Sequence, residues 1–157
     1  MFEVVAAWMT AAKAAVEAAL PDAYVTLGPF VNWDEMGGLD VVIIGHDDTA
    51  DPPVSFSFEG GYRDTGANAV TDGEVRVPVS IYSAAGTTDL DMPARIVAAS
   101  TLHTAVRDAL MPSPALSALG VTGLMWAHES EVVARLIPYT TGPIACLVCT
   151  YVLATLV

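Results

Sequence analysis

The chain has 157 residues, of which 54% are hydrophobic, and its 18 acidic and 6 basic residues give a net charge of −12. This length favours a single domain, residues 1–157, whose core can fold without disulfides or a structural metal. The acidic excess argues against sequence-specific nucleic-acid binding and against attachment to anionic lipid, since both need clusters of Lys and Arg. We expect neither a secretory signal nor a membrane span, because the longest apolar run, Ile144–Val157, is too short to cross a bilayer.

The first third of the chain predicts a helix followed by short strands. Phe2–Leu20 has bulky apolar residues at helical spacing and stops before Pro21. Tyr24–Leu27 is a short strand candidate, and the apolar run Val41–Ile44 is typical of a strand covered on both faces. Alternating aromatic residues predict a further strand over Val54–Tyr62.

The middle of the chain predicts a mobile loop and then a long strand. Arg63–Gly73 is polar and rich in Gly and Asn without periodicity, which indicates the loop. Glu74–Ser83 alternates between apolar and other residues, as a strand does. Pro78 lacks an N–H, so we expect this strand at a sheet edge or a bulge, and an edge would be open to a neighbouring chain.

A second helix is predicted near residues 91–111, where Asp91 can cap it and Pro112 ends it. Arg95 lies close to its apolar stripe in the first turn, where the helix macrodipole disfavours a cation. Arg95 can pair with Asp91, or it can reach a carboxylate or carbonyl of a neighbouring subunit. In the second case Arg95→Glu would weaken assembly and leave the subunit folded. The expected buried stripe comprises Ile96, Ala99, Leu102, Val106 and Leu110.

The last third predicts strands within Val121–Ile137 and Gly142–Val157. Both faces of the final strand are apolar, so helices should cover one face, and the second helix or another chain should cover the other. The elements together predict an α+β fold, in which a mixed or antiparallel sheet of about four to six strands packs against the N-terminal helix and the second helix.

Neither cysteine is expected to do chemistry. Cys146 and Cys149 form a C-x-x-C pair inside a predicted strand, where side chains three residues apart point to opposite faces. We therefore interpret them as two small buried hydrophobic residues. His103, on the apolar side of its helix, and His128, which shares a strand face with Trp126, are interpreted as structural.

The acidic turn around His46 is the best candidate for metal chemistry. A hard cation could bind here, although the spacing of an EF-hand is absent. A solvated acidic turn is the favoured interpretation, and a small metal-dependent hydrolase is the remote alternative. The chain lacks nucleotide-binding glycine loops and nucleophile elbows, so we expect no enzymatic activity, metal or cofactor. The residues of this candidate are His46, Asp47, Asp48 and Asp51.

Several segments follow one another in an order that is typical of one family. They are Asp40-Val41-Val42-Ile43-Ile44-Gly45, Gly73-Glu74-Val75-Arg76-Val77, Tyr82-Ser83-Ala84-Ala85-Gly86, the helix with Arg95 and Ala109-Leu110, Pro114-Ala115-Leu116 and Leu124-Met125-Trp126-Ala127. With the apolar C-terminal strand, this order resembles the tail terminator (tail-completion) proteins of long-tailed bacteriophages, particularly those that infect actinobacteria. Val132–Tyr139 departs from the pattern, because the family commonly has a more polar turn there.

The resemblance implies an α+β subunit of a hexameric ring at the head-proximal end of the tail in the virion, assembled in the host cytoplasm. Such a ring stops polymerisation of the tail tube protein and presents a surface to the head–tail connector or stopper protein. DNA passes through it without specific binding, and no membrane is involved. A connector stopper or a tail-tube subunit is the alternative within the same class.

Two groups of residues follow as candidates for contacts in such a ring. No basic residue lies between Lys13 and Arg63, so an acidic lumen that repels DNA is one expectation. The candidates for the lumen are Asp34, Glu35, Asp40, Asp47, Asp48 and Asp51. The candidates for the subunit interface, besides the predicted loop, are Arg76, Pro78, Ser80, Tyr82, Asp91 and Arg95.

Overall fold

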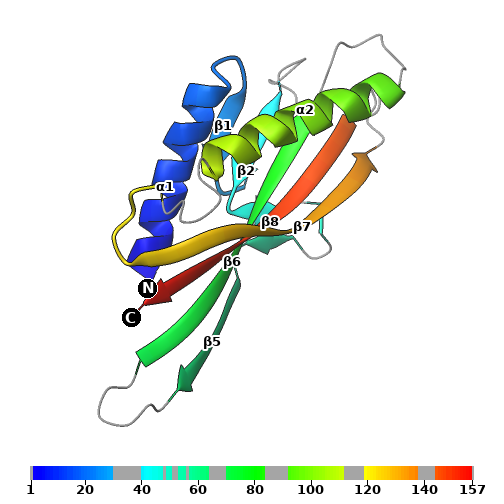
Figure 1. Ribbon diagram of the computed structural model, residues 1–157. Coiled ribbons are helices and arrows are strands. Elements are labelled where there is room, and N and C mark those ends of the chain that lie inside the picture. Colours follow the sequence, from blue (N-terminus) through cyan, green and yellow to red (C-terminus); the bar gives the residue numbers. More distant parts are fainter. Residues whose placement is uncertain are drawn as a thin grey trace.

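The computed structural model of the protein describes residues 2–29, 40–47, 49–50, 53–55, 57–63, 70–83, 92–111, 119–137 and 144–156. Helices α1 (Phe2–Ala19) and α2 (Met92–Leu110) cover one face of a mixed sheet of eight strands (Figure 1). This arrangement confirms the predicted α+β class. The strands are β1 (Tyr24–Leu27), β2 (Val41–Ile44), β3 (His46–Asp47), β4 (Val54–Ser55), β5 (Ser57–Arg63), β6 (Val70–Ser83), β7 (Leu124–Ile137) and β8 (Ile144–Leu156).

Strands β6 and β8 form the middle of the sheet. They are antiparallel and paired from Asp72–Leu156 to Ser83–Ala145. β7 pairs with the other side of β8, and β2 pairs with the C-terminal part of β6 and with β1, to which it is parallel. β5 pairs with the N-terminal part of β6, so the residues predicted as a loop are partly strand: Arg63 ends β5 and residues 70–73 begin β6.

The prediction that β6 lies at a sheet edge or a bulge is wrong, because β6 has partners on both sides and pairs with β8 without a register shift. The place of Pro78 between two partner strands explains why the middle of β6 tolerates a proline. On one side of β6, Pro78 is opposite Thr150 of β8. On the other side, β5 pairs as far as Arg76 and β2 pairs from Val79. The carbonyl of Pro78 accepts a bond from Gly45 N (2.7 Å) on that second side, and the N and O of one strand residue point the same way. The missing N–H therefore faces the gap between the two partner strands, where no ladder bond is lost.

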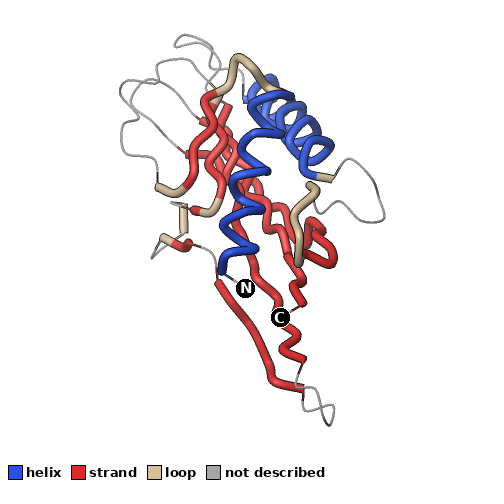
Figure 2. Tube along the Cα trace, turned by 90° about the vertical axis from the view of Figure 1, so that its left-hand side faces the viewer, coloured by secondary structure: helices blue, strands red, loops and turns tan. Residues whose placement is uncertain are grey.

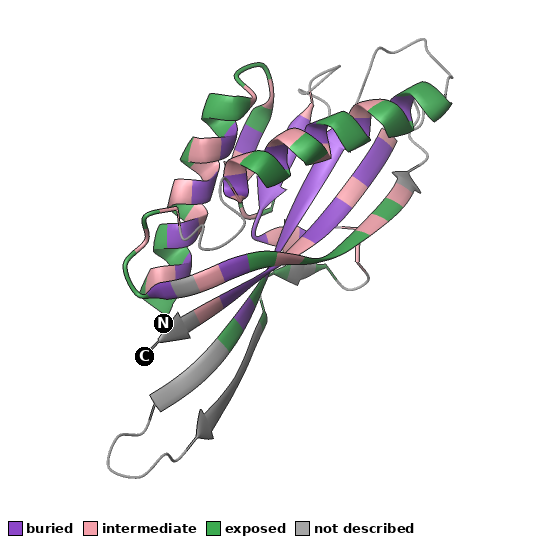
Figure 3. Ribbon diagram, in the orientation of Figure 1, coloured by how far each residue is buried: buried purple, intermediate pink, exposed green. Residues whose placement is uncertain are grey.

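The main core lies between the helices and the sheet. Trp8 of α1 is fully buried, and its ring centroid lies 5.9 Å from that of Tyr151 on β8. α2 adds Leu102, Val106 and Leu110 to the same core. The figures show both helices in one layer beside the sheet, with buried and exposed positions alternating along each helix (Figures 2 and 3). Neither described helix is long and apolar enough to cross a membrane.

A second, smaller core lies on the opposite face of the sheet. Arg135 of β7 donates from Nη1 to Thr49 O at 2.5 Å. Because β3 adjoins β6 at Val79 and β8 separates β6 from β7, this bond links the segment after β3 to β7 across β8. The expectation that the second helix or another chain covers this face is wrong, because α2 packs on the main core and the apolar residues of this face are buried within the subunit. They are Val41, Ile43, Tyr82, Cys146 and Val148, with Ile144 packed against them.

Gly45 makes the turn that separates β2 from β3. Its φ is +86°, in a region that L-residues with a side chain rarely adopt, and a Cβ there would meet the flexible end of Met9. Gly28 has a similar φ of +75° but has open space around the position of a Cβ. A comparison of substitutions at the two glycines therefore distinguishes the cost of a positive φ from the cost of crowding against Met9.

We predict that Gly45→Ala lowers the free energy of unfolding by about 1–3 kcal/mol, because the strain of positive φ adds to the displacement of Met9. Gly28→Ala is the matched control and should cost only about 1–2 kcal/mol. Urea denaturation followed by circular dichroism measures both. Equal costs at the two positions would show that Met9 moves aside freely.

Candidate functional site

Most of the predicted interface residues are buried inside the subunit. Pro78, Ser80 and Tyr82 are buried, and the hydroxyl of Ser80 donates to His46 O (3.0 Å). These residues therefore serve the packing of β6 against its neighbours and offer little surface to another chain. Arg76 is exposed on β6, while Asp91 lies outside the described residues.

Arg95 is also buried, with 4% of its surface exposed. The buried stripe of α2 begins at Arg95 and continues through Ala99 and Leu102, so the predicted member Ile96 falls outside it and is 48% exposed. Apolar periodicity alone placed Ile96 inwards because it counted only apolar residues as members of the stripe, although Arg95 lies close to it.

The acidic candidates do not form one surface. Asp47 is buried, and its Oδ1 accepts bonds from Thr49 N (2.9 Å) and Thr49 Oγ1 (2.5 Å), so it closes the turn that carries Thr49 to Arg135. Asp47, a candidate for the lumen, therefore exposes little surface in the subunit. Asp40 is half-buried, and its carbonyl accepts a bond from Tyr24 N (2.9 Å). Four candidates lie outside the described residues: Asp34, Glu35, Asp48 and Asp51.

The same geometry bears on the remote hydrolase alternative. His46 Nδ1 lies 3.3 Å from Ser55 Oγ across the β3–β4 pair, whereas the Asp47 carboxylate is engaged by Thr49. The two described members of the proposed cluster thus bind different partners. The metal interpretation of this turn gains no support from them.

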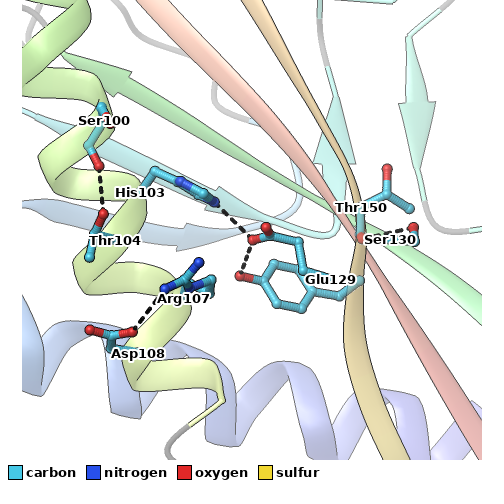
Figure 4. A network of polar contacts seen from close by, with 9 residues as sticks. Ser100, His103, Thr104, Arg107, Asp108, Glu129, Ser130 and Thr150 are labelled. Carbon is cyan, nitrogen blue, oxygen red and sulfur yellow. Dashed lines mark hydrogen bonds and ion pairs between the residues drawn. The ribbon is translucent and has the colours of Figure 1, made fainter. Parts of the chain in front are cut away.

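A polar cluster that the sequence did not reveal lies between α2 and the sheet. His103 of α2 donates from Nε2 to Glu129 Oε2 of β7 at 2.9 Å, and Tyr151 of β8 donates its hydroxyl to the same oxygen at 3.2 Å (Figure 4). The side chains of His103 and Glu129 are only 16% and 14% exposed. This cluster joins the helix to two strands and gives the imidazole of His103 a partner within the subunit.

A β-bulge aims Glu129 at the helix. Glu129 is opposite Tyr151 and Glu131 is opposite Thr150, so Ser130 is the extra residue in β7. The Ser130 hydroxyl donates to Thr150 O (3.1 Å) and holds the bulge in place. Without the extra residue, simple alternation would give Glu129 and Glu131 the same face. The bulge instead turns Glu129 to the helix side and Glu131 to the opposite side.

Two buried groups beside Glu129, the Tyr151 phenol and the Cys149 thiol, stay protonated. Burial raises the pKa of the Tyr151 phenol, and the negative charge of Glu129 and the bond to it raise that pKa further. Burial likewise raises the pKa of the Cys149 thiol, with added contributions from Glu129 and Cys146. Both groups are neutral at physiological pH, so Cys149 has none of the thiolate character of a reactive cysteine.

The two cysteines lie on opposite faces of β8, as predicted. Cys146 belongs to the smaller core, and Cys149 belongs to the main core beneath α2. Both are free thiols. Trp126 and His128 share a face of β7 with ring centroids 4.8 Å apart, which confirms their predicted proximity.

Large exposed apolar side chains gather at the two outer edges of the sheet. At the β1 edge, Tyr24 and Leu27 are exposed. At the β7 edge, Val132 faces the helix layer yet remains 42% exposed. Ile96 and Val97 are exposed on α2 itself. The helix layer therefore leaves the outermost strand β7 partly uncovered (Figure 3).

Comparisons with known proteins identify no family. No family model matches the chain, and no curated protein matches it. Among solved structures, a chain of the "Virion of native gene transfer agent (GTA) particle" is similar, with a TM-score of 0.48, 15% sequence identity, and coverage of 90% of this chain and 84% of that chain. Similarity at this level does not establish a function.

We predict that Arg95→Glu destabilises the fold itself, by about 3–5 kcal/mol, because it reverses a buried charge. Arg107→Glu is the matched control on the same helix. The Arg107 side chain is 50% exposed, and its substitution should cost less than about 1 kcal/mol. Thermal unfolding of both variants measures the difference. A folded Arg95→Glu subunit that only fails to assemble would restore the interface role expected from the sequence.

Proposed function

We propose that the protein is a structural virion subunit: a tail terminator that forms a ring on the head-proximal end of a phage tail tube, stops tube polymerisation and offers the head connector a docking surface. The order of segments from Asp40 to the C-terminal strand, which resembles the tail terminator family, supports this proposal. The similar solved chain belongs to a gene transfer agent virion, and this origin is compatible with a virion subunit.

The proposed ring rests mainly on one observation: apolar surface is exposed at both ends of the sheet. In the strand order β1-β2-β6-β8-β7, the exposed Tyr24 and Leu27 of β1 and the exposed Val132 of β7 lie at opposite ends. Two different surfaces on opposite sides of a subunit suit a head-to-tail contact. Such contacts close into a ring when the rotation between neighbours divides a full turn.

The β5–β6 hairpin offers a third contact. Its strands project beyond the helices, and β5 pairs only with β6 among the described strands (Figures 1 and 2). A two-stranded hairpin by itself is only marginally stable in water, so a further contact would stabilise these strands. A neighbouring subunit or the end of the tube would bury them.

The charge of the chain suits a channel for DNA. Each subunit adds −12, so a ring repels a polyanion and lets it slide without adhering. The acids that face the channel do not include Asp47, which is buried.

We predict that Val132→Asp and the pair Tyr24→Ser with Leu27→Ser each reduce ring formation, by roughly tenfold or more in the association constant, because each change removes one of the two apolar surfaces. Mass photometry of the purified protein, with and without tube subunits, gives the distribution of assemblies. Ala14→Ser, at an exposed position of α1, is the control and should assemble normally.

Mixing the two kinds of variant tests the head-to-tail arrangement. A Val132 variant and a Tyr24/Leu27 variant retain one complete interface between them, so the mixture should form dimers and no rings. Rings in the mixture, or full assembly of either variant alone, would refute this arrangement.

Virions made without the protein distinguish the terminator from its rivals. We predict overlong tails in negative-stain images, because nothing would stop the tube from growing. Tails of normal length that fail to join heads would instead indicate a connector stopper, and absent tails would indicate a tube subunit. Expression of the protein from a plasmid should restore the normal length.

A further inference from the structure

The polar cluster beneath α2 contains a set of metal ligands that its structural role does not require. Ligand atoms of His103, Glu129 and Cys149 all lie within 4.8 Å of one another. They come from α2, β7 and β8, so three separate elements converge on one point. We propose that these three side chains form a binding site for a zinc ion, which clamps α2 to the edge of the sheet.

The donor set selects the kind of metal. A thiolate and an imidazole favour Zn²⁺ over Ca²⁺ or Mg²⁺, which prefer oxygen ligands throughout. Bonds of about 2.0–2.3 Å in a tetrahedron place ligand atoms roughly 3.3–3.8 Å apart. The atoms of the cluster lie within 4.8 Å, so small side-chain rotations bring them to this spacing.

The charges balance at the site. Glu129 and the Cys149 thiolate together carry two negative charges, and the neutral imidazole of His103 adds none, so they compensate one Zn²⁺. Binding exchanges the bond between His103 and Glu129 for two bonds to the metal. The proton on His103 Nε2 moves by way of solvent to Nδ1, which leaves a neutral imidazole with a free lone pair, and the thiol proton is released to solvent. Water takes the fourth position.

Tyr151 is placed to orient the carboxylate. Its hydroxyl donates to Glu129 Oε2 at 3.2 Å, as groups behind a metal ligand commonly do. Cys149 forms the buried wall of the site, while His103 and Glu129 are slightly exposed. Val132, opposite Cys149 on β7, is 42% exposed, so an ion can enter from the margin between α2 and β7.

Titration of the tag-free, chelator-treated full chain tests the site. We expect one Zn²⁺ per chain and a rise in Tm of roughly 5–10 °C when zinc is in hundredfold excess over its Kd. Co²⁺ in place of Zn²⁺ should give the charge-transfer band of a cobalt–thiolate bond together with the visible bands of tetrahedral cobalt. Absence of stoichiometric binding, or Co²⁺ binding without the thiolate band, would overturn the proposal.

The second cysteine provides a matched control. Cys149→Ser should abolish the thiolate band and weaken zinc binding at least ~10-fold, whereas Cys146→Ser, on the other face of β8, should retain both. His103→Asn changes a less buried ligand and should weaken binding similarly, which decides the matter if Cys149→Ser does not fold. His128→Gln controls for zinc held by exposed imidazole. Wild-type affinity in both Cys149→Ser and His103→Asn would refute the site.

Discussion

The ladder between β6 and β8 runs from Asp72–Leu156 to Ser83–Ala145, with apolar side chains buried on both faces over much of its length. Backbone groups in such a position have no water to bond, so each must pair within the sheet. This requirement fixes where the other elements lie. α1 and α2 cover one face, Arg135 bonds the segment after β3 on the other, and β2 and β5 divide the remaining side of β6 at Pro78.

Much of this fold follows from local pattern. The helix Phe2–Ala19, the strand Tyr24–Leu27 and the two-sided burial of Val41–Ile44 match expectation, because spacing and burial are encoded by adjacent residues. The opposite faces of Cys146 and Cys149 follow from alternation alone. These features need no knowledge of what the segments pack against.

The errors arise where tertiary context overrides such a pattern. Pro78 is compatible with an edge or with an interruption between two partner strands, and local sequence does not distinguish them. Arg95 takes the inward place that periodicity gave to Ile96. The cluster of His103 with Glu129 depends on an extra residue at Ser130 and on a contact between positions 26 residues apart, so periodicity carries no signal for it.

The irregular course of β7 also affects how molecules of this protein can meet. β7 pairs only with β8 among the described strands, and its register shifts between Leu124 and Trp126 and again between Glu129 and Glu131. Each shift puts the outward N–H and C=O groups out of step with those of an incoming strand. An incoming strand therefore cannot follow the whole of β7 in one register and meets a regular edge only within Trp126–Glu129 or Glu131–Ile137, which limits edge-to-edge pairing of copies and favours side-chain packing as the means of joining them here.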